Sequence, residues 1–279
     1  TLAWSYHPHA FKVRCKDTAS PYDVFKDKEL FSNGIRKKIK GVFFDKEDNW
    51  EDLRSQSNTT KEKIRGILRR VSGSQMVSNF RPVTASMLYK VFCDQGDTVW
   101  DMSCGWGGRL LGALSSKRVK KYIGTEPSTK TFEGLNKIKD DFSYLGKEVE
   151  LNCLGSEVFK PKEKVDLCFT SPPYFNTEKY ADEPTQSYIK YPTEQEWIDG
   201  FLHDTLKNTY ESLKDNGYLL MNIAKTSSGK NIEDGTLKIT KELGYTHINT
   251  LRLNLSTMAR DGEGSGSKFE PIFVFKKVK

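Results

Sequence analysis

The chain of 279 residues lacks the features of several protein classes. Its five cysteines lie far apart, with no Cys-x-x-Cys pair and no cysteine–histidine cluster at zinc spacing, so we expect reduced thiols and no structural metal. No apolar run approaches the ~20 residues that a membrane span needs. The start, Thr1-Leu2-Ala3-Trp4, lacks the basic and apolar stretches of a secretory signal. We therefore expect an intracellular, cytoplasmic protein without a membrane partner.

Positive charge is concentrated near the beginning of the chain. Residues 1–79 hold 16 Lys and Arg against 10 Asp and Glu, whereas the rest of the chain is nearly neutral, with 28 against 27. Basic side chains displace counterions from phosphates, so this flank fits a polyanionic partner; a merely soluble surface is the alternative. One basic segment, Lys61–Val71, has a helical pattern. We interpret residues 1–79 as a basic extension that contacts DNA, a second copy of the chain or a partner subunit.

From residue 80 onward, short β-rich runs alternate with helical stretches, which predicts an α/β domain over 80–279 with a parallel sheet covered on both faces. No helix separates the last two strands, so we expect an antiparallel hairpin with a mobile tip at Ser256–Glu270. The expected strands are Thr98–Met102, Lys121–Thr125, Val149–Cys153, Val165–Thr170, Tyr218–Ala224, His247–Leu255 and Ile272–Lys276. The expected helices are Thr84–Cys93, Gly108–Ser116, Thr129–Tyr144, Glu194–Leu213 and Ile232–Leu243.

Two turns after the first two strands predict a nucleoside site. The first strand continues as Asp101-Met102-Ser103-Cys104-Gly105-Trp106-Gly107-Gly108, whose glycines let the backbone turn sharply beside a ligand. The second ends at Glu126-Pro127, where a carboxylate can accept both hydroxyls of a ribose. Asp101 would repel a phosphate and tolerate an ammonium group, which favours S-adenosylmethionine over a dinucleotide. A nicotinamide oxidoreductase is the disfavoured alternative.

The fourth strand runs directly into Ser171-Pro172-Pro173-Tyr174. Prolines fix φ and lack N–H groups, so the chain leaves the sheet rigidly and exposes its carbonyls. An exocyclic amine of adenine or cytosine is a poor nucleophile because its lone pair is delocalised into the ring. The Ser171 hydroxyl and the Pro172 carbonyl can accept both of its N–H groups and localise that lone pair, while Tyr174 stacks on a flipped base. An ordinary Pro-Pro turn with a buried tyrosine is the alternative.

Residues 80–279 resemble, in this order of motifs, the DNA amino-methyltransferases that modify adenine N6 or cytosine N4. Ser171–Tyr174 matches the catalytic motif of that family, Asp101–Gly108 resembles its glycine-rich cofactor motif, and Glu126 resembles its ribose-binding acid. The resemblance implies a seven-stranded, Rossmann-like class I methyltransferase sheet with its last strand antiparallel. It also implies S-adenosylmethionine as cofactor and double-stranded DNA, with base flipping, as partner.

Two further segments fit the resemblance. Asn79-Phe80-Arg81-Pro82 resembles the segment that contacts the methionine end of the cofactor, where Arg81 would pair with the carboxylate. Gly155-Ser156-Glu157, after the third strand, is where the family contacts the adenine of the cofactor. Met102 and Trp106 depart from the usual glycine motif, and we expect intact cofactor binding with altered packing there.

The substrate stays open at several points. Serine at the first motif position favours cytosine N4, but adenine N6 shares the same chemistry. An RNA amino-methyltransferase and a catalytically silent nucleic-acid-binding subunit are the alternatives, and the biological role, restriction-modification included, is not specified. Carbon-5 methylation is rejected because no Pro-Cys nucleophile is present. The Tyr- and Lys-rich segment Phe175–Thr193 is either a loop over the target strand or an ordinary exposed loop, and Trp197 is expected in the core.

Overall fold

The computed structural model describes residues 2–15, 18–29, 77–226, 229–254 and 269–278. The chain forms two units. The larger unit comprises Thr1–His7, Asn79–Thr177 and Ala181–Lys279, and the smaller one comprises Pro8–Ser78 and Glu178–Tyr180. The first seven residues therefore group with the sheet and not with the rest of the basic extension. The predicted helix Lys61–Val71 and the predicted mobile hairpin tip lie outside the described residues, apart from the last two residues of the tip.

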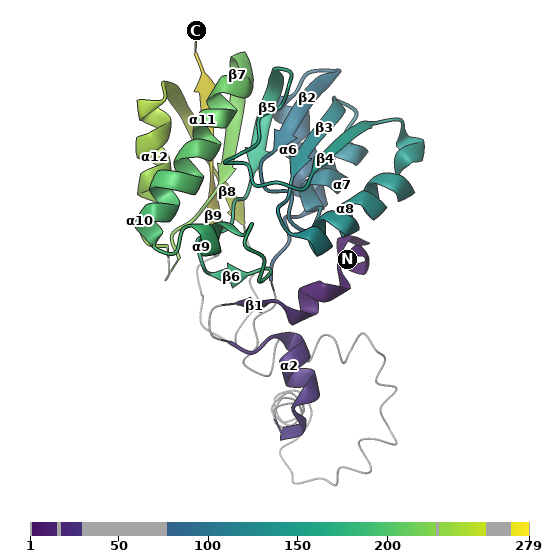
Figure 1. Ribbon diagram of the computed structural model, residues 1–279. Helices are drawn as coiled ribbons and strands as arrows, with labels where there is room; N and C mark the ends of the chain where they lie inside the picture. The colour runs from purple at the N-terminus through teal and green to yellow at the C-terminus, as the bar shows by residue number, and fades with distance from the viewer. Residues whose placement is uncertain (1, 16–17, 30–76, 227–228, 255–268, 279) are drawn as a thin grey trace, which may run out of the picture. The chain divides into compact units, whose positions relative to one another are not determined.

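The larger unit is built on a seven-stranded sheet of order β4-β3-β2-β5-β7-β9-β8 (Figure 1). In the described sheet β9 alone is reversed, since it pairs antiparallel with both β7 and β8 while the other neighbours are parallel. This order confirms the predicted Rossmann-like class I methyltransferase sheet. The strands are β2 (Asp97–Asp101), β3 (Val119–Thr125), β4 (Glu148–Asn152), β5 (Val165–Thr170), β7 (Leu213–Asn222), β8 (Tyr245–Asn254) and β9 (Phe269–Lys277).

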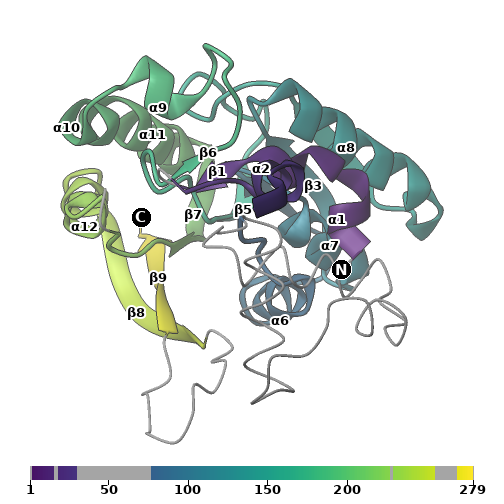
Figure 2. The same cartoon turned by 90° about the horizontal axis from the view of Figure 1, so that it is seen from below.

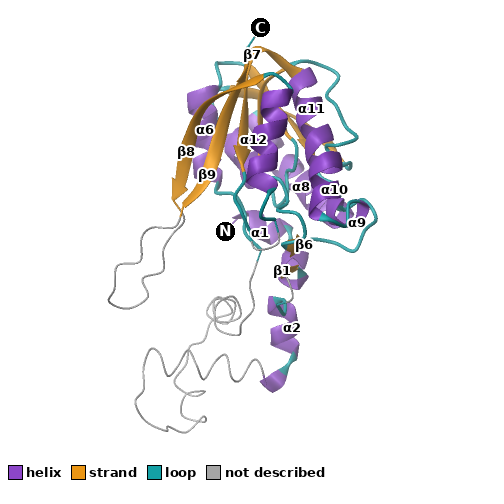
Figure 3. Ribbon diagram, turned by 90° about the vertical axis from the view of Figure 1, so that its left-hand side faces the viewer, coloured by secondary structure: helices purple, strands orange, loops and turns teal. Residues whose placement is uncertain are grey.

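Helices cover both faces of the sheet because alternate residues of its strands enter two different cores. On β5, Leu167 and Phe169 enter one core, with α6, α7 and α8, whereas Cys168 enters the other, with α10, α11 and α12. Figure 2 shows these two groups of helices, and in Figure 3 α6 and α12 lie on either side of the sheet. None of the described helices is long and apolar enough to cross a membrane. The helices of this unit are α1 (Leu2–Tyr6), α6 (Pro82–Phe92), α7 (Gly108–Ser115), α8 (Thr129–Asp141), α9 (Ser187–Lys190), α10 (Glu194–Trp197), α11 (His203–Ser212) and α12 (Ile232–Glu242), with a 3₁₀ turn, η2, at Ser143–Leu145.

The helix predicted over 194–213 is interrupted. A π-helical segment, η3 (Ile198–Leu202), separates α10 from α11. Gly200 lies in this segment, and a Cβ there would be 2.3 Å from a ring carbon of Tyr191, so the missing side chain makes room for that ring. Trp197 is fully buried, as predicted.

The smaller unit contains a short two-stranded antiparallel sheet, with Arg14 opposite Lys179 and Cys15 opposite Glu178. Ser20 begins the following helix with a capping box, in which its side chain and that of Asp23 each accept a backbone N–H of the other residue. Arg14 also pairs with Asp23 at 2.9 Å. The elements are a 3₁₀ turn, η1 (Pro8–Lys12), β1 (Arg14–Cys15), α2 (Pro21–Lys26) and β6 (Glu178–Lys179).

Candidate active site

The structure brings the predicted cofactor and catalytic turns to one edge of the sheet. β2 and β5 are parallel neighbours, with Trp100 opposite Cys168, so their carboxyl ends lie side by side. At this edge the Thr170 hydroxyl donates to Oδ1 of Asp101 at 3.0 Å. Ser171 follows Thr170 directly, and Ser103 lies two residues after Asp101. The Ser-Pro-Pro-Tyr turn and the glycine turn are therefore neighbours at the edge where α/β folds bind ligands.

The glycine turn requires its glycines for backbone reasons. Gly105 and Gly107 have positive φ values of 52° and 77°. Gly108 begins α7, and a Cβ there would lie 1.9 Å from the carbonyl oxygen of Phe80. The segment that was predicted to contact the methionine end of the cofactor is thus packed against the start of α7. Within this segment, Arg81 is exposed and makes no ion pair with any other described residue.

Asp101 differs from its prediction. Its carboxylate is buried and pairs with Nε of Arg109 at 2.8 Å, and it also accepts the Tyr122 hydroxyl at 2.7 Å. The backbone N–H of Ser103 donates to it as well, at 3.2 Å. Although burial lowers the pKa of Arg109, the Asp101 carboxylate raises it above its ordinary value, so the guanidinium stays charged. Asp101 therefore supports the glycine turn, and its charge is paired with Arg109 instead of facing a ligand alone, as the sequence argument had assumed.

Glu126 lies at the end of β3, in contact with the glycine turn. Its carboxylate accepts the backbone N–H groups of Gly105 and Ser128, both at 3.0 Å. Burial raises the pKa of Glu126 to about 7, against the lowering effect of these two hydrogen bonds, and the nearby Asp101 and Glu183 raise it further. An ionised carboxylate in this place can accept further hydrogen bonds from hydroxyl groups.

The turn after β4 is fastened to α11. Oγ of Ser156 shares a hydrogen bond of 2.8 Å with the Thr205 hydroxyl, and the Asn208 amide donates to the carbonyls of Ser156 and Glu157, at 3.0 and 3.2 Å. Glu157 is buried and pairs with Lys190. The Ser156 side chain thus serves to position this turn. Lys190 pairs with Oε1 of Glu157, whereas the buried Oε2 has no hydrogen-bond partner among the described residues.

The Ser-Pro-Pro-Tyr turn is held in a strained but well-packed conformation. Pro172 is buried, and Tyr174 is half-buried with its hydroxyl donating to the Asn222 carbonyl at 3.3 Å. Phe175, directly after the turn, has φ of 54°, a left-handed conformation that is costly for a residue with a side chain. The buried ring of Phe175 packs edge-on against Trp197, at 6.5 Å between ring centroids, which offsets this strain.

The segment after the Ser-Pro-Pro-Tyr turn is hydrogen-bonded to the loop between β3 and α8, a feature that the sequence did not reveal. Glu183 caps α8, because Thr129 donates both its backbone N–H, at 3.1 Å, and its hydroxyl, at 2.8 Å, to the Glu183 carboxylate. The Thr185 hydroxyl donates to the carbonyl of Pro127 at 3.1 Å. No pattern in the sequence marks these contacts, which join residues more than fifty positions apart.

The predicted target-contacting side chains of this segment are largely engaged within the protein. The Tyr188 hydroxyl donates to the Ala181 carbonyl at 2.7 Å, and Lys190 pairs with Glu157. Tyr191 packs against the core beneath α10 and α11. Lys179 and Tyr180 belong to the smaller unit.

The first helix supports the glycine turn. The rings of Trp4 and His7 contact Trp106, with centroids 5.6 and 5.4 Å apart. Trp106 is one of the two departures from the family motif, and it is buried here. Trp106 thus packs against Trp4 of α1 and against His7, which follows that helix.

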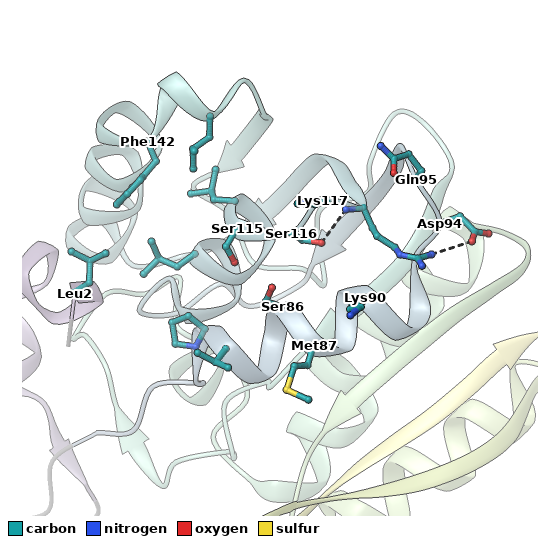
Figure 4. A pocket seen from close by; sticks show the side chains of 16 residues that line it. Leu2, Ser86, Met87, Lys90, Asp94, Gln95, Ser115, Ser116, Lys117 and Phe142 are labelled. Carbon is teal, nitrogen blue, oxygen red and sulfur yellow. Dashed lines mark hydrogen bonds and ion pairs between the residues drawn. The ribbon is translucent and has the colours of Figure 1, made fainter.

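A separate hollow lies at the opposite edge of the sheet. It has a volume of about 1150 Å³ and lies between α6 and α7, beside the loops that precede β2 and β3 (Figure 4). Met87, Lys90, Leu111 and Arg118 are among its lining residues, which share only Pro82 with the segments predicted to bind the cofactor. It is therefore distinct from the candidate active site. In the described part of the chain, no group of His, Cys, Asp and Glu can hold a metal ion.

Comparison with known proteins gives similarities of fold. No family model matches the chain, and no curated protein matches it. Among solved structures, a methyltransferase from Pyrococcus furiosus has 17% identity and a TM-score of 0.49, covering 82% of this chain and 98% of that chain. A SAM-dependent O-methyltransferase from Thermotoga maritima has 17% identity and a TM-score of 0.48, covering 73% and 68%. The N-methyltransferase NodS from Bradyrhizobium japonicum has 9% identity and a TM-score of 0.47, covering 71% and 93%.

Proposed function

We propose that the chain is an S-adenosylmethionine-dependent methyltransferase that modifies the exocyclic amino group of a base in DNA. The observation that carries this proposal is the hydrogen bond between Thr170 and Asp101. It joins the strand end that carries the Ser-Pro-Pro-Tyr turn to the strand end that carries the glycine turn. A nucleoside cofactor and a base can therefore meet at one edge of the sheet.

The residues present fit the adenosine part of the cofactor. Glu126 offers a buried carboxylate beside a glycine turn that leaves room for a ligand. Glu157 has a buried carboxylate oxygen, Oε2, without a hydrogen-bond partner among the described residues. These acceptors match the hydroxyls of a ribose and the amino group of a purine. Arg81, exposed and without an ion pair in the described chain, suits the carboxylate of an amino acid.

The Ser-Pro-Pro-Tyr turn supplies what the amine needs. When bound, S-adenosylmethionine supplies a methyl group made electrophilic by the sulfonium. The Ser171 hydroxyl and the Pro172 carbonyl hold the two N–H groups, which localises the nitrogen lone pair towards that methyl group. The nitrogen would form the new N–C bond as the bond between sulfur and the methyl carbon breaks, with its electron pair left on a neutral thioether, S-adenosylhomocysteine. The nitrogen would then release one proton to solvent. Tyr174 stacks on the base after it leaves the duplex.

The choice of base is part of the proposal. Serine at the first position of the turn favours cytosine N4 over adenine N6. The basic residues of the first 79 positions favour a polyanionic partner, and duplex DNA is the partner that we propose.

Methyl transfer onto nucleic acid tests this proposal. The protein is incubated with S-adenosylmethionine labelled on its methyl group and with duplex DNA or structured RNA, and the nucleosides are then analysed by mass spectrometry. We expect N4-methylcytosine in DNA, and none with a Ser171→Ala, Tyr174→Ala double variant. N6-methyladenine would correct the base, methylation of RNA alone would correct the nucleic acid, and methylation of carbon or of no base would overturn the proposal.

A further inference from the structure

Helix α6 exposes an apolar face beside the hollow at the opposite edge of the sheet. Val83, Met87 and Val91 follow one another at i, i+4 and i+8 on this helix, and they are 73%, 64% and 71% exposed. The other side of α6 is packed in the core, and Lys90 is the one charged residue of the helix. A helix that is apolar on both sides is normally buried on both sides, so the outer face of α6 indicates an interaction surface.

The hollow beside this face, the α6 groove, is concave and has fixed walls. Leu111 and Leu114 of α7 form its floor and are buried. Helices α6 and α7 are in close contact, since a Cβ at Gly112 would lie 2.5 Å from Cβ of Ala85. The volume of about 1150 Å³ exceeds the roughly 300–1,000 Å³ of a pocket for a small molecule. The groove therefore has the size for a segment of polypeptide, and the 11 residues of α6 can run beside about three helical turns.

One end of the α6 groove carries an excess of positive charge. Lys90, Lys117 and Arg118 line it together with a single carboxylate, that of Asp94. Arg118 pairs with Asp94 at 3.6 Å, whereas neither lysine makes an ion pair with another described residue. Leu2 lies at the other, apolar end (Figure 4). A ligand that fills the groove must therefore be apolar along its length and acidic at one end.

These features distinguish between the possible occupants of the α6 groove. A second copy of the chain would bring a second excess of positive charge to the contact, and like charges oppose association. An anionic membrane could neutralise the two lysines, but a flat surface does not reach Leu111 and Leu114 on the floor of a concave groove. A helix with one apolar face and flanking acidic residues satisfies both the floor and the lysines.

We propose that the α6 groove binds an acidic amphipathic helix of a partner protein. The apolar face of that helix packs against Met87 and the two floor leucines, and its carboxylates pair with Lys90 and Lys117. The inference goes beyond the proposed function and does not rest on it, because the groove binds neither the cofactor nor the base.

Selection from a peptide library on the full chain tests this proposal. The library holds helical peptides with leucine at i, i+3, i+4 and i+7 and with Glu or Lys randomised at the other positions. We expect the selected peptides to carry Glu in preference to Lys and to bind with micromolar dissociation constants, measured by fluorescence anisotropy. Met87→Ala should weaken the selected Glu-rich peptide about tenfold, because it removes apolar area from the contact. Lys90→Glu together with Lys117→Glu should weaken it by a similar factor and favour a Lys-rich peptide.

Two matched controls separate the groove from general effects. Lys238→Glu with Lys241→Glu reverses two exposed lysines of α12, on the other face of the sheet, and should leave the affinity unchanged. Because Met87 is exposed, the thermal midpoint of Met87→Ala should equal that of the wild type.

Several results would overturn the proposal. They are a selection without preference for Glu, no peptide bound at all, and binding that is unchanged in Met87→Ala and in the lysine variants. Binding to phosphatidylglycerol vesicles that Met87→Glu abolishes, without peptide binding, would assign the groove to a membrane instead. A dimer in analytical ultracentrifugation that Met87→Glu dissociates would assign it to a second copy of the chain.

Discussion

The affinity for S-adenosylmethionine should fall on acidification because of Glu126. Burial raises the pKa of this carboxyl to about 7, well above the ordinary value for glutamate. The ionised carboxylate can accept two ribose hydroxyls, whereas the protonated acid has one acceptor site fewer. Cofactor binding therefore competes with protonation between pH 6 and 8, roughly one unit on either side of the raised pKa.

The size of the effect follows from the pKa. With a pKa of about 7, the ionised fraction is about 0.9 at pH 8 and about 0.1 at pH 6, so the dissociation constant should be about tenfold weaker at pH 6. Binding near neutral pH should also release up to one proton, because the ribose hydroxyls lower the pKa of the bound carboxylate. Ionisation of Glu126 changes the free energy of unfolding in the opposite direction to ionisation of an ordinary salt-bridged carboxylate. Since the folded pKa is raised, ionisation of Glu126 destabilises the free protein as pH rises towards 7.

Calorimetry with S-adenosylhomocysteine, in buffers of different ionisation enthalpy, measures both the affinity and the proton count. Glu126→Gln should bind more weakly at pH 8, lose the pH dependence and release no proton. Glu133→Gln is the matched control, because Glu133 is exposed on α8. A wild-type affinity that is equal at pH 6 and pH 8, with no proton released, would refute this role of Glu126.

Two further predictions concern the frame of the site and its partner. Asp101→Ala leaves the buried Arg109 without its counter-ion and should lower the free energy of unfolding by about 3–5 kcal/mol in urea denaturation; a decrease below about 1 kcal/mol would contradict the buried pair. Replacing Lys63, Arg65 and Arg69 with glutamine should reduce the slope of DNA affinity against salt by about 0.9 for each phosphate that is no longer neutralised. An unchanged slope would assign another role to the basic segment.

Most of the sheet could be predicted from the sequence because its strands are short apolar runs with clear ends. The strand over Val165–Thr170 has the same bounds in the structure, and the predicted hairpin of β8 and β9 is antiparallel. The predicted start of β7, at Tyr218, is too late. β7 begins at Leu213, which pairs with Val165 of β5. The polar residues that follow, including Asn216 with its positive φ, look like a turn in the sequence, so the first part of the strand was not predicted.

The environment of individual site residues was less predictable. The sequence places Asp101 near a glycine turn, but it does not show that Arg109, eight residues later, folds back to neutralise it. Glu183 and Thr185 lie in a loop without periodicity, so nothing in their spacing indicates that they reach Thr129 and Pro127, after β3. Trp4 was likewise unmarked, because its contact with Trp106 is set by tertiary packing alone.

The central claim is that the Ser-Pro-Pro-Tyr turn holds the base while the neighbouring turns hold the cofactor. Single-turnover methyl transfer and S-adenosylhomocysteine affinity, measured on Tyr174→Ala, test this division most directly, with Tyr174→Phe as the control that keeps the ring. The account predicts that Tyr174→Ala slows transfer by about 10- to 100-fold, the worth of a base stack, with cofactor affinity nearly unchanged, while Tyr174→Phe stays close to wild type. Abolished cofactor binding with a normal transfer rate in Tyr174→Ala would contradict it.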